Sequence, residues 1–200
     1  MSEPFAYPSA PHQRRHGPKG YADYQSYRPW LRDEFSFRCV YCLLREQWGQ
    51  IRGGHGIDHF QAIAVRPSKL NDYDNLLFAC LPCNAMKSKR MIGDPTELLT
   101  APNVSVTDDG VIHTDNPEAA KLIEALGLDS PQATELRALW IDIIALAAGN
   151  DEPLYRQLMG FPDHLPNLAR LRPPGGNRRQ EGVDASYYAA RQRRTLPETY

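Results

Sequence analysis

The stretches Cys39-Val-Tyr-Cys42 and Cys80-Leu-Pro-Cys83 contain all four cysteines of the chain. Thiolates two residues apart lie at the tip of a tight turn, and two such turns complete the tetrahedral four-sulfur shell that Zn²⁺ accepts. In a reducing compartment, paired CxxC motifs are more typical of a metal site than of disulfides. The spacing therefore predicts a structural zinc site. A redox-active thiol pair and inert buried thiols are the alternatives.

The composition is that of an ordinary folded protein. A chain of 200 residues, 42% of them hydrophobic, fits one domain with additions or two small ones. No run approaches the roughly 18 apolar residues of a membrane span, and residues 1–20 lack the apolar centre of a secretory signal. We therefore expect a cytoplasmic protein with no membrane partner. The formal net charge of −1 does not decide for or against a nucleic-acid partner, because the arrangement of charge matters more than its sum.

The segment between the cysteine pairs contains Gly54-His-Gly-Ile-Asp-His-Phe60, which places Asp58 next to His59 among apolar residues. Asn75 follows, just before the apolar stretch that leads to the second cysteine pair. Each of these polar residues also has an ordinary structural explanation, as a surface histidine, a salt-bridge partner or a turn residue. Neighbours on a regular strand point to opposite faces, so Asp58 and His59 should diverge unless the strand is twisted or irregular.

A helix is predicted to begin at the second cysteine pair, because Pro82 suits a first helical turn. Asn84 would lie near its N-terminus, where free amide groups and the helix dipole attract an anion such as phosphate. Lys87, Lys89 and Arg90 follow along the helix. They are predicted to contact a nucleic-acid backbone; the alternatives are a helix cap for Asn84 and a solvated basic face for the other three.

This order of residues resembles the HNH nucleases, also called the ββα-metal group. In that family an Asp-His or His-His pair lies on the first strand, an asparagine precedes the second strand, and an Asn or His opens the helix. Many members clamp this unit with CxxC pairs. The matching stretches are CVYC, GIDHF and YDNLLFACLPCNAMKS, within about residues 38–90. The resemblance implies an α+β fold: a zinc-clamped ββα-metal (HNH) core with an added β-hairpin, C-terminal helices and flexible termini.

The resemblance also implies roles for four residues. His59 would be the general base, since a neutral imidazole with a pKa of about 6.5 suits that role at cellular pH. Asn75 would hydrogen-bond nearby backbone to orient His59. Asp58 and Asn84 would share one divalent cation, which would also bind the scissile phosphate. Both offer oxygen ligands, so the expected ion is Mg²⁺ or Mn²⁺. Where some members carry a second histidine on the helix, this chain has Ser88 or Lys87, which leaves the identity of the ion open.

We expect four regions along the chain. Residues 1–20, rich in proline, histidine and arginine, are typical of a disordered tail. Residues 21–95 would form the nuclease domain, and residues 96–170 a hairpin around Asp109-Gly110 followed by helices. Residues 171–200 form a basic tail with interleaved tyrosines, which is either disordered in solvent or holds a phosphate backbone.

Helices in the third region are predicted from their start signals. Asn116 and Ser130 are N-cap residues that precede proline, so helices should begin at Pro117 and Pro131, and a shorter one is predicted for residues 153–159. The second of these helices carries an apolar stripe that we expect in the core, made up of Leu136, Leu139, Trp140, Ile143 and Ala147.

The function predicted by the resemblance is that of a metal-dependent endonuclease, which hydrolyses DNA phosphodiester bonds and leaves a 5′ phosphate. The alternative is a non-cleaving, zinc-stabilised module that binds nucleic acid. A thiol redox protein is a third, weaker reading. DNA is the expected partner, and no small-molecule substrate is expected. Neither the target sequence nor the oligomeric state follows from the sequence.

Overall fold

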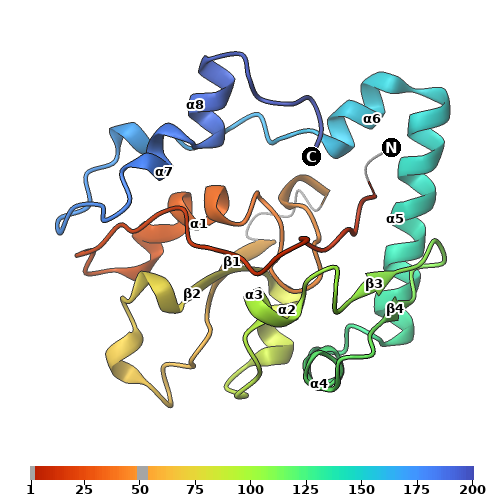
Figure 1. Ribbon diagram of the computed structural model, residues 1–200, viewed down its shortest axis with the longest axis horizontal. Coiled ribbons are helices and arrows are strands. Elements are labelled where there is room, and N and C mark those ends of the chain that lie inside the picture. The colour runs from red at the N-terminus through yellow and green to blue at the C-terminus, as the bar shows by residue number, and fades with distance from the viewer. Residues whose placement is uncertain (1–2, 49–53) are drawn as a thin grey trace.

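Two short antiparallel strands and the helix that follows them lie at the centre of the fold (Figure 1). The computed structural model describes residues 3–48 and 54–200. In it, β1 (His55–His59) pairs with β2 (Leu76–Cys80), and His55 lies opposite Cys80. β2 runs directly into α2 (Leu81–Lys87), which has proline in its first turn as predicted. The fold is a mixture of helices and small sheets, which confirms the α+β class.

The core is built around β2, which is buried along its whole length. A strand covered on both faces has no polar side, so β2 is a continuous apolar run. The short helix α1 (Arg28–Glu34) packs against β2, after the 3₁₀ turn η1 (Tyr24–Tyr27). Further 3₁₀ turns are η2 (Glu46–Trp48), η3 (Pro67–Lys69) and η4 (Tyr73–Asn75). The turn η4 leads straight into β2 and so fixes the position of Asn75.

The hairpin and helices after the central unit are where the sequence predicted them. Following α3 (Pro95–Leu98), β3 (Ser105–Val106) pairs with β4 (Ile112–His113) around Asp109-Gly110, and Gly110 has a φ of 80°. Then come α4 (Pro117–Leu126), α5 (Pro131–Asn150) and α6 (Glu152–Met159). The side chains of Asn116 and Ser130 accept hydrogen bonds from the first turns of α4 and α5, as N-caps do.

The predicted core stripe of α5 was wrong in part. Leu136 and Leu139 are exposed, with relative accessibilities of 47% and 55%, whereas Ile144 and Ala147 are buried. α5 is apolar around much of its circumference, so its sequence alone does not identify the face that meets the core. Among the described residues, no helix has both the length and the hydropathy needed to cross a membrane.

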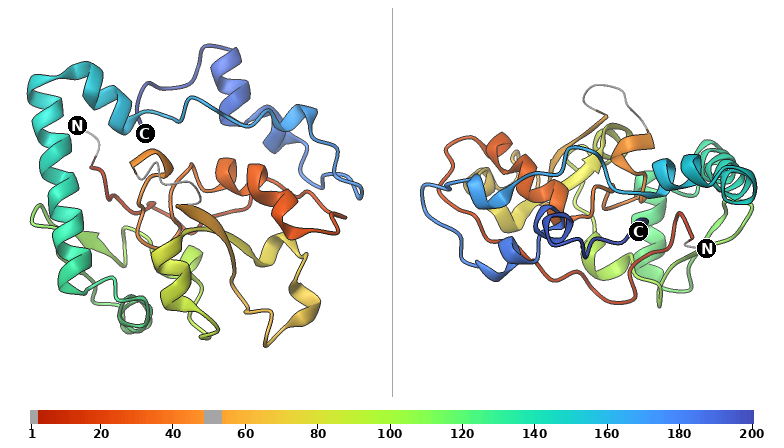
Figure 2. Two further views of the ribbon diagram at one scale, coloured as in Figure 1. Left: turned by 180° about the vertical axis from the view of Figure 1, so that it is seen from behind. Right: turned by 90° about the horizontal axis from the view of Figure 1, so that it is seen from above.

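The expectation of disordered tails was also wrong for the described residues. In the first region, Phe5, Tyr7 and His16 are buried. The last region contains α7 (Glu181–Asp184) and α8 (Tyr187–Gln192), preceded by η5 (Leu168–Arg170). Pro18 and Asn177 form an antiparallel bridge that joins these two regions, and Figure 2 shows the N-terminal and C-terminal segments side by side. The buried carboxylates of Asp33 and Glu34 accept hydrogen bonds from His16 in the first segment, and Asp33 also accepts from the main-chain N–H of Tyr187 in the last one.

Candidate functional site

The four cysteines meet in one cluster. Their sulfur atoms all lie within 4.8 Å of one another, and the Sγ atoms of Cys42 and Cys80 are 3.7 Å apart. A disulfide would need an S–S distance of about 2.05 Å, whereas Zn–S bonds of about 2.3 Å place tetrahedral sulfurs about 3.8 Å apart. The cluster could therefore hold a zinc ion, as the CxxC spacing predicts.

Both cysteine pairs are fixed by the elements that carry them. Cys39 and Cys42 lie in a turn in which the N–H of Leu43 donates to the carbonyl of Cys39. The N–H of Val40, inside that turn, donates to the carbonyl of Phe78 in β2. The second pair spans the end of β2 and the first turn of α2. A metal held here would join the turn after α1 to both β2 and α2.

The thiols in this cluster cannot all ionise unaided. Burial opposes ionisation of Cys39, but hydrogen bonds from the other three thiols lower its pKa well below the usual value. The pKa values of Cys42 and Cys83 are raised, and the largest cause at both is the hydrogen bond to Cys39. One thiolate is thus favoured and further ones are opposed, so a bound cation is what would allow all four to be anionic.

His59 is held in a single tautomer. Its Nε2 atom lies 2.9 Å from the carbonyl oxygen of Leu70, and the ring of Tyr24 packs edge-on against it at 4.7 Å between centroids. A carbonyl oxygen only accepts hydrogen bonds, so Nε2 carries the hydrogen and, in the neutral ring, Nδ1 carries the lone pair. The ring is therefore arranged so that Nδ1 can accept a proton.

Asn75 ties together the backbone on both sides of that ring. Its Oδ1 accepts from the N–H of Gln61 at 2.8 Å, and its Nδ2 donates to the carbonyls of Gln61 and Lys69 at 3.1 and 3.2 Å. Gln61 closely follows His59, and Lys69 precedes the residue that binds Nε2. Such bonds suit a residue that orients His59, although the catalytic roles of both stay predictions.

Asp58 is buried between two donors. Its Oδ2 accepts from the hydroxyl of Tyr41 at 2.5 Å, and its Oδ1 lies 3.1 Å from the Nζ of Lys87. Burial, followed by the charge of Asp58 and the hydrogen bond to it, raises the pKa of Tyr41 well above its usual value, so the phenol keeps its proton. Tyr41 was missed in the sequence, although it stands inside the first CxxC motif.

The two neighbours in the Asp-His pair face different partners, as strand alternation predicts. Asp58 faces Tyr41 and Lys87, and the His59 ring faces Leu70 and Tyr24. Asn84, half-buried, donates from Nδ2 to the carbonyl of Ile57 at 3.3 Å.

As arranged, Asp58 and Asn84 do not fit a divalent cation, because an ammonium group already occupies the carboxylate.

The predicted basic contacts divide into two groups. Lys87, expected at the surface, is wholly buried, and its Nζ also donates to the carbonyl of His59 at 2.7 Å. A helical position defines a face, but it does not reveal that a neighbouring strand offers a carboxylate to that face. Lys89 and Arg90 are exposed, and Arg90 donates to the carbonyl of Ala125 in α4.

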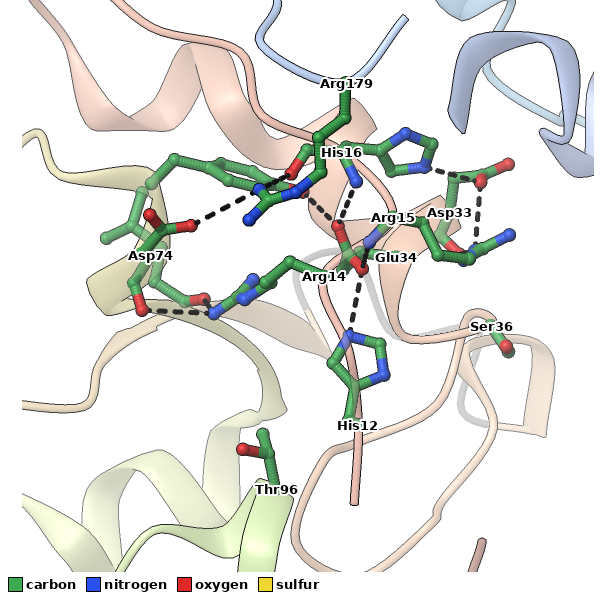
Figure 3. Close-up of polar contacts among 12 residues, drawn as sticks. His12, Arg14, Arg15, His16, Asp33, Glu34, Ser36, Asp74, Thr96 and Arg179 are labelled. Atoms are coloured by element: carbon green, nitrogen blue, oxygen red, sulfur yellow. Dashed lines mark hydrogen bonds and ion pairs between the residues drawn. The ribbon is translucent and has the colours of Figure 1, made fainter. Parts of the chain in front are cut away.

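A second polar cluster lies where the N-terminal segment crosses α1 (Figure 3). Glu34 accepts from His12 Nε2, from the main-chain N–H groups of Arg15 and His16, and from the hydroxyl of Tyr73, at 2.7 to 3.0 Å. Burial alone would raise the pKa of Glu34, but the hydrogen bonds from His12 and Arg15 outweigh it and lower that pKa to about 2. Tyr73 stands just before Asn75, so this cluster joins the N-terminal segment to the turn that carries Asn75.

Basic residues of the C-terminal region reach the same turn. Arg178 forms a 2.8 Å ion pair with Asp74. The guanidinium of Arg179 lies 3.8 Å from the same carboxylate (Figure 3). Beside them is a polar cavity of about 450 Å³, whose lining includes His12, Arg14, Phe60, Asp74, Thr96 and Arg179. Part of the basic tail therefore lies next to the β1–β2 unit, and no pattern in the sequence predicted this placement.

Compared with known proteins, the chain matches no protein-family model and no curated relative.

Proposed function

We propose that the chain is an endonuclease that hydrolyses phosphodiester bonds in DNA, with His59 as the general base. The observation that carries this proposal is the fixed tautomer of His59: the Leu70 carbonyl holds Nε2–H, which leaves the lone pair on Nδ1. Asn75 fastens the backbone around that ring by three hydrogen bonds. The ring lies on the strand that pairs with β2, which leads into the second cysteine pair.

Hydrolysis of a phosphodiester needs a base that takes a proton from water and positive charge that offsets the charge on phosphorus. His59 Nδ1 would accept the proton of the attacking water. Lys89, Arg178 and Arg179 are basic groups outside the buried core that could pair with the nucleic-acid backbone. Mg²⁺ or Mn²⁺ stays the expected catalytic cation, but its binding at Asp58 requires Lys87 to move.

A second candidate function is a non-cleaving module that binds nucleic acid. The observation in its favour is the buried ion pair between Lys87 and Asp58, which leaves the carboxylate closed to a metal. In that case the four-cysteine cluster would only stabilise a binding surface.

A nicking assay on supercoiled plasmid DNA, with Mg²⁺ or Mn²⁺ added, distinguishes the two candidate functions. We expect the wild type to nick the plasmid and His59→Ala to reduce the rate by about a hundredfold or more, the usual contribution of a general base. His113→Ala is the matched control, because His113 is an exposed histidine on β4 whose loss should leave the rate unchanged.

Circular dichroism melts of all three proteins establish that the variants fold. A wild type that binds DNA and leaves the plasmid intact with either ion would replace the nuclease with the binding module. A folded His59→Ala that nicks at the wild-type rate would show that the base is another group.

A further inference from the structure

Lys87 is the least expected side chain in the candidate site. Its relative accessibility is 0%, and lysine is almost never fully buried unless it is paired. The Nζ atom lies 3.1 Å from Asp58 Oδ1 and 2.7 Å from the carbonyl oxygen of His59. It therefore contacts the acidic residue of the Asp-His pair and the backbone of the other member.

The carboxylate of Asp58 is enclosed by groups from two elements. Lys87 is the last residue of α2, and its side chain reaches back to β1. From the other side, the Tyr41 hydroxyl reaches Oδ2 from the first CxxC turn. A buried ion pair gains little net stability, because removing both charges from water offsets their attraction. Stability alone is thus a weak reason for this arrangement.

A divalent cation at the same oxygen would lie close to the ammonium group. An Mg²⁺–O bond is about 2.1 Å long, and Nζ lies 3.1 Å from Oδ1, so the two cations would be at most about 5 Å apart, the sum of the two distances. Two positive charges that close, in a site with little water between them, repel strongly. Asp58 can be neutralised by either cation, but not readily by both together.

We propose that Lys87 is a built-in competitor of the catalytic cation. In the absence of metal the ammonium of Lys87 neutralises Asp58, and a divalent cation binds only when it displaces that ammonium. This inference rests on the proposed function in that it takes Asp58 as a ligand of the catalytic ion. It makes cation binding weak, and it makes Lys87 a positioning residue that determines whether Asp58 is open.

The test measures the affinity of the full, zinc-loaded chain for Mn²⁺ in the absence of DNA. The electron paramagnetic resonance signal of free Mn²⁺ reports how much of the ion is unbound. We expect Lys87→Met to bind Mn²⁺ at least roughly tenfold more tightly than the wild type. Lys121→Met is the matched control, because it removes the same charge from an exposed position on α4, and it should bind Mn²⁺ as the wild type does. Adding Asp58→Asn to Lys87→Met should abolish the gain.

A folded Lys87→Met protein whose Mn²⁺ affinity is unchanged or weaker would overturn the inference. If Lys87→Met does not fold, Lys87→Gln gives the same test, since it keeps an N–H donor toward Asp58 without the charge. The result is separate from the nuclease proposal. A wild type that cuts DNA, with unchanged affinity in the variant, would refute only the competition. Tighter binding in the variant, with no cutting by the wild type, would refute only the nuclease.

Discussion

Replacing Glu34 by glutamine should destabilise the fold in a way that depends on pH. The side chain of Glu34 is fully buried, and both carboxylate oxygens accept two hydrogen bonds each, from His12 and Arg15 on one and from His16 and Tyr73 on the other. Glutamine has nearly the same shape, but one of its two terminal atoms is an N–H donor. Whichever oxygen it replaces, that atom would face a main-chain N–H, of Arg15 or of His16, which can only donate, so at least one of the four bonds would be lost together with the charge.

The magnitude follows from the pKa of Glu34, which falls from 4.5 to about 2. At about 1.36 kcal/mol per pH unit, this difference corresponds to about 3 kcal/mol of stability. The folded pKa is the lower one, so this contribution is complete above about pH 4.5 and is lost as the pH falls from there toward 2. Glu34→Gln should therefore unfold more easily at neutral pH, and the gap to the wild type should close in acid.

Urea unfolding of both proteins from neutral pH down to about pH 3 measures this gap. Glu97→Gln is the control, because Glu97 is an exposed glutamate on α3, and its replacement should change stability by less than about 0.5 kcal/mol. A neutral-pH gap for Glu34→Gln below about 1 kcal/mol, or a gap that widens in acid, would refute the reasoning. It would mean that the N-terminal segment does not dock on α1 through this carboxylate.

Two further predictions concern the zinc cluster and the backbone around His59. Cys39→Ser or Cys83→Ser, or treatment with a chelator, should lower the melting temperature sharply, because structural zinc contributes folding energy directly; a thermal melt that none of these changes would contradict a metal role for the cluster. Asn75→Ala removes three hydrogen bonds to Gln61 and Lys69, so it should cost about 2 to 3 kcal/mol in urea unfolding and slow plasmid nicking by at least roughly tenfold. Nicking at the wild-type rate would show that Asn75 does not orient His59.

Local signals in the sequence predicted much of the fold. The spacing of the cysteine pairs was enough to predict that four sulfurs gather, because a CxxC turn constrains its own geometry. N-cap residues at 116 and 130 predicted where α4 and α5 begin, and Asp109-Gly110 predicted the hairpin. For the caps and the hairpin, the stabilising contact lies within a few residues of the signal; for the cysteines, the metal-ligand spacing of both pairs is itself the signal.

What could not be predicted depends on contacts between distant parts of the chain. Residues 1–20 and 171–200 have the composition of disordered tails, but His16 pairs with Asp33 at 2.9 Å and Arg178 with Asp74. The burial of Lys87 likewise depends on Asp58, which reaches it from another element. Composition and periodicity indicate whether a residue by itself favours burial or exposure. Whether a charged residue is buried in an ion pair depends on a partner from a distant part of the chain, which neither of them reveals.

The most direct test of the central claim is the mapping of cleavage products on an end-labelled DNA duplex. It compares the zinc-loaded wild type and His59→Ala, with Mg²⁺ or Mn²⁺ and with a chelator. We predict internal cuts that leave 5′ phosphates, that require an added cation and that disappear in His59→Ala. A duplex that stays intact under every condition, although the protein binds it, would contradict the claim.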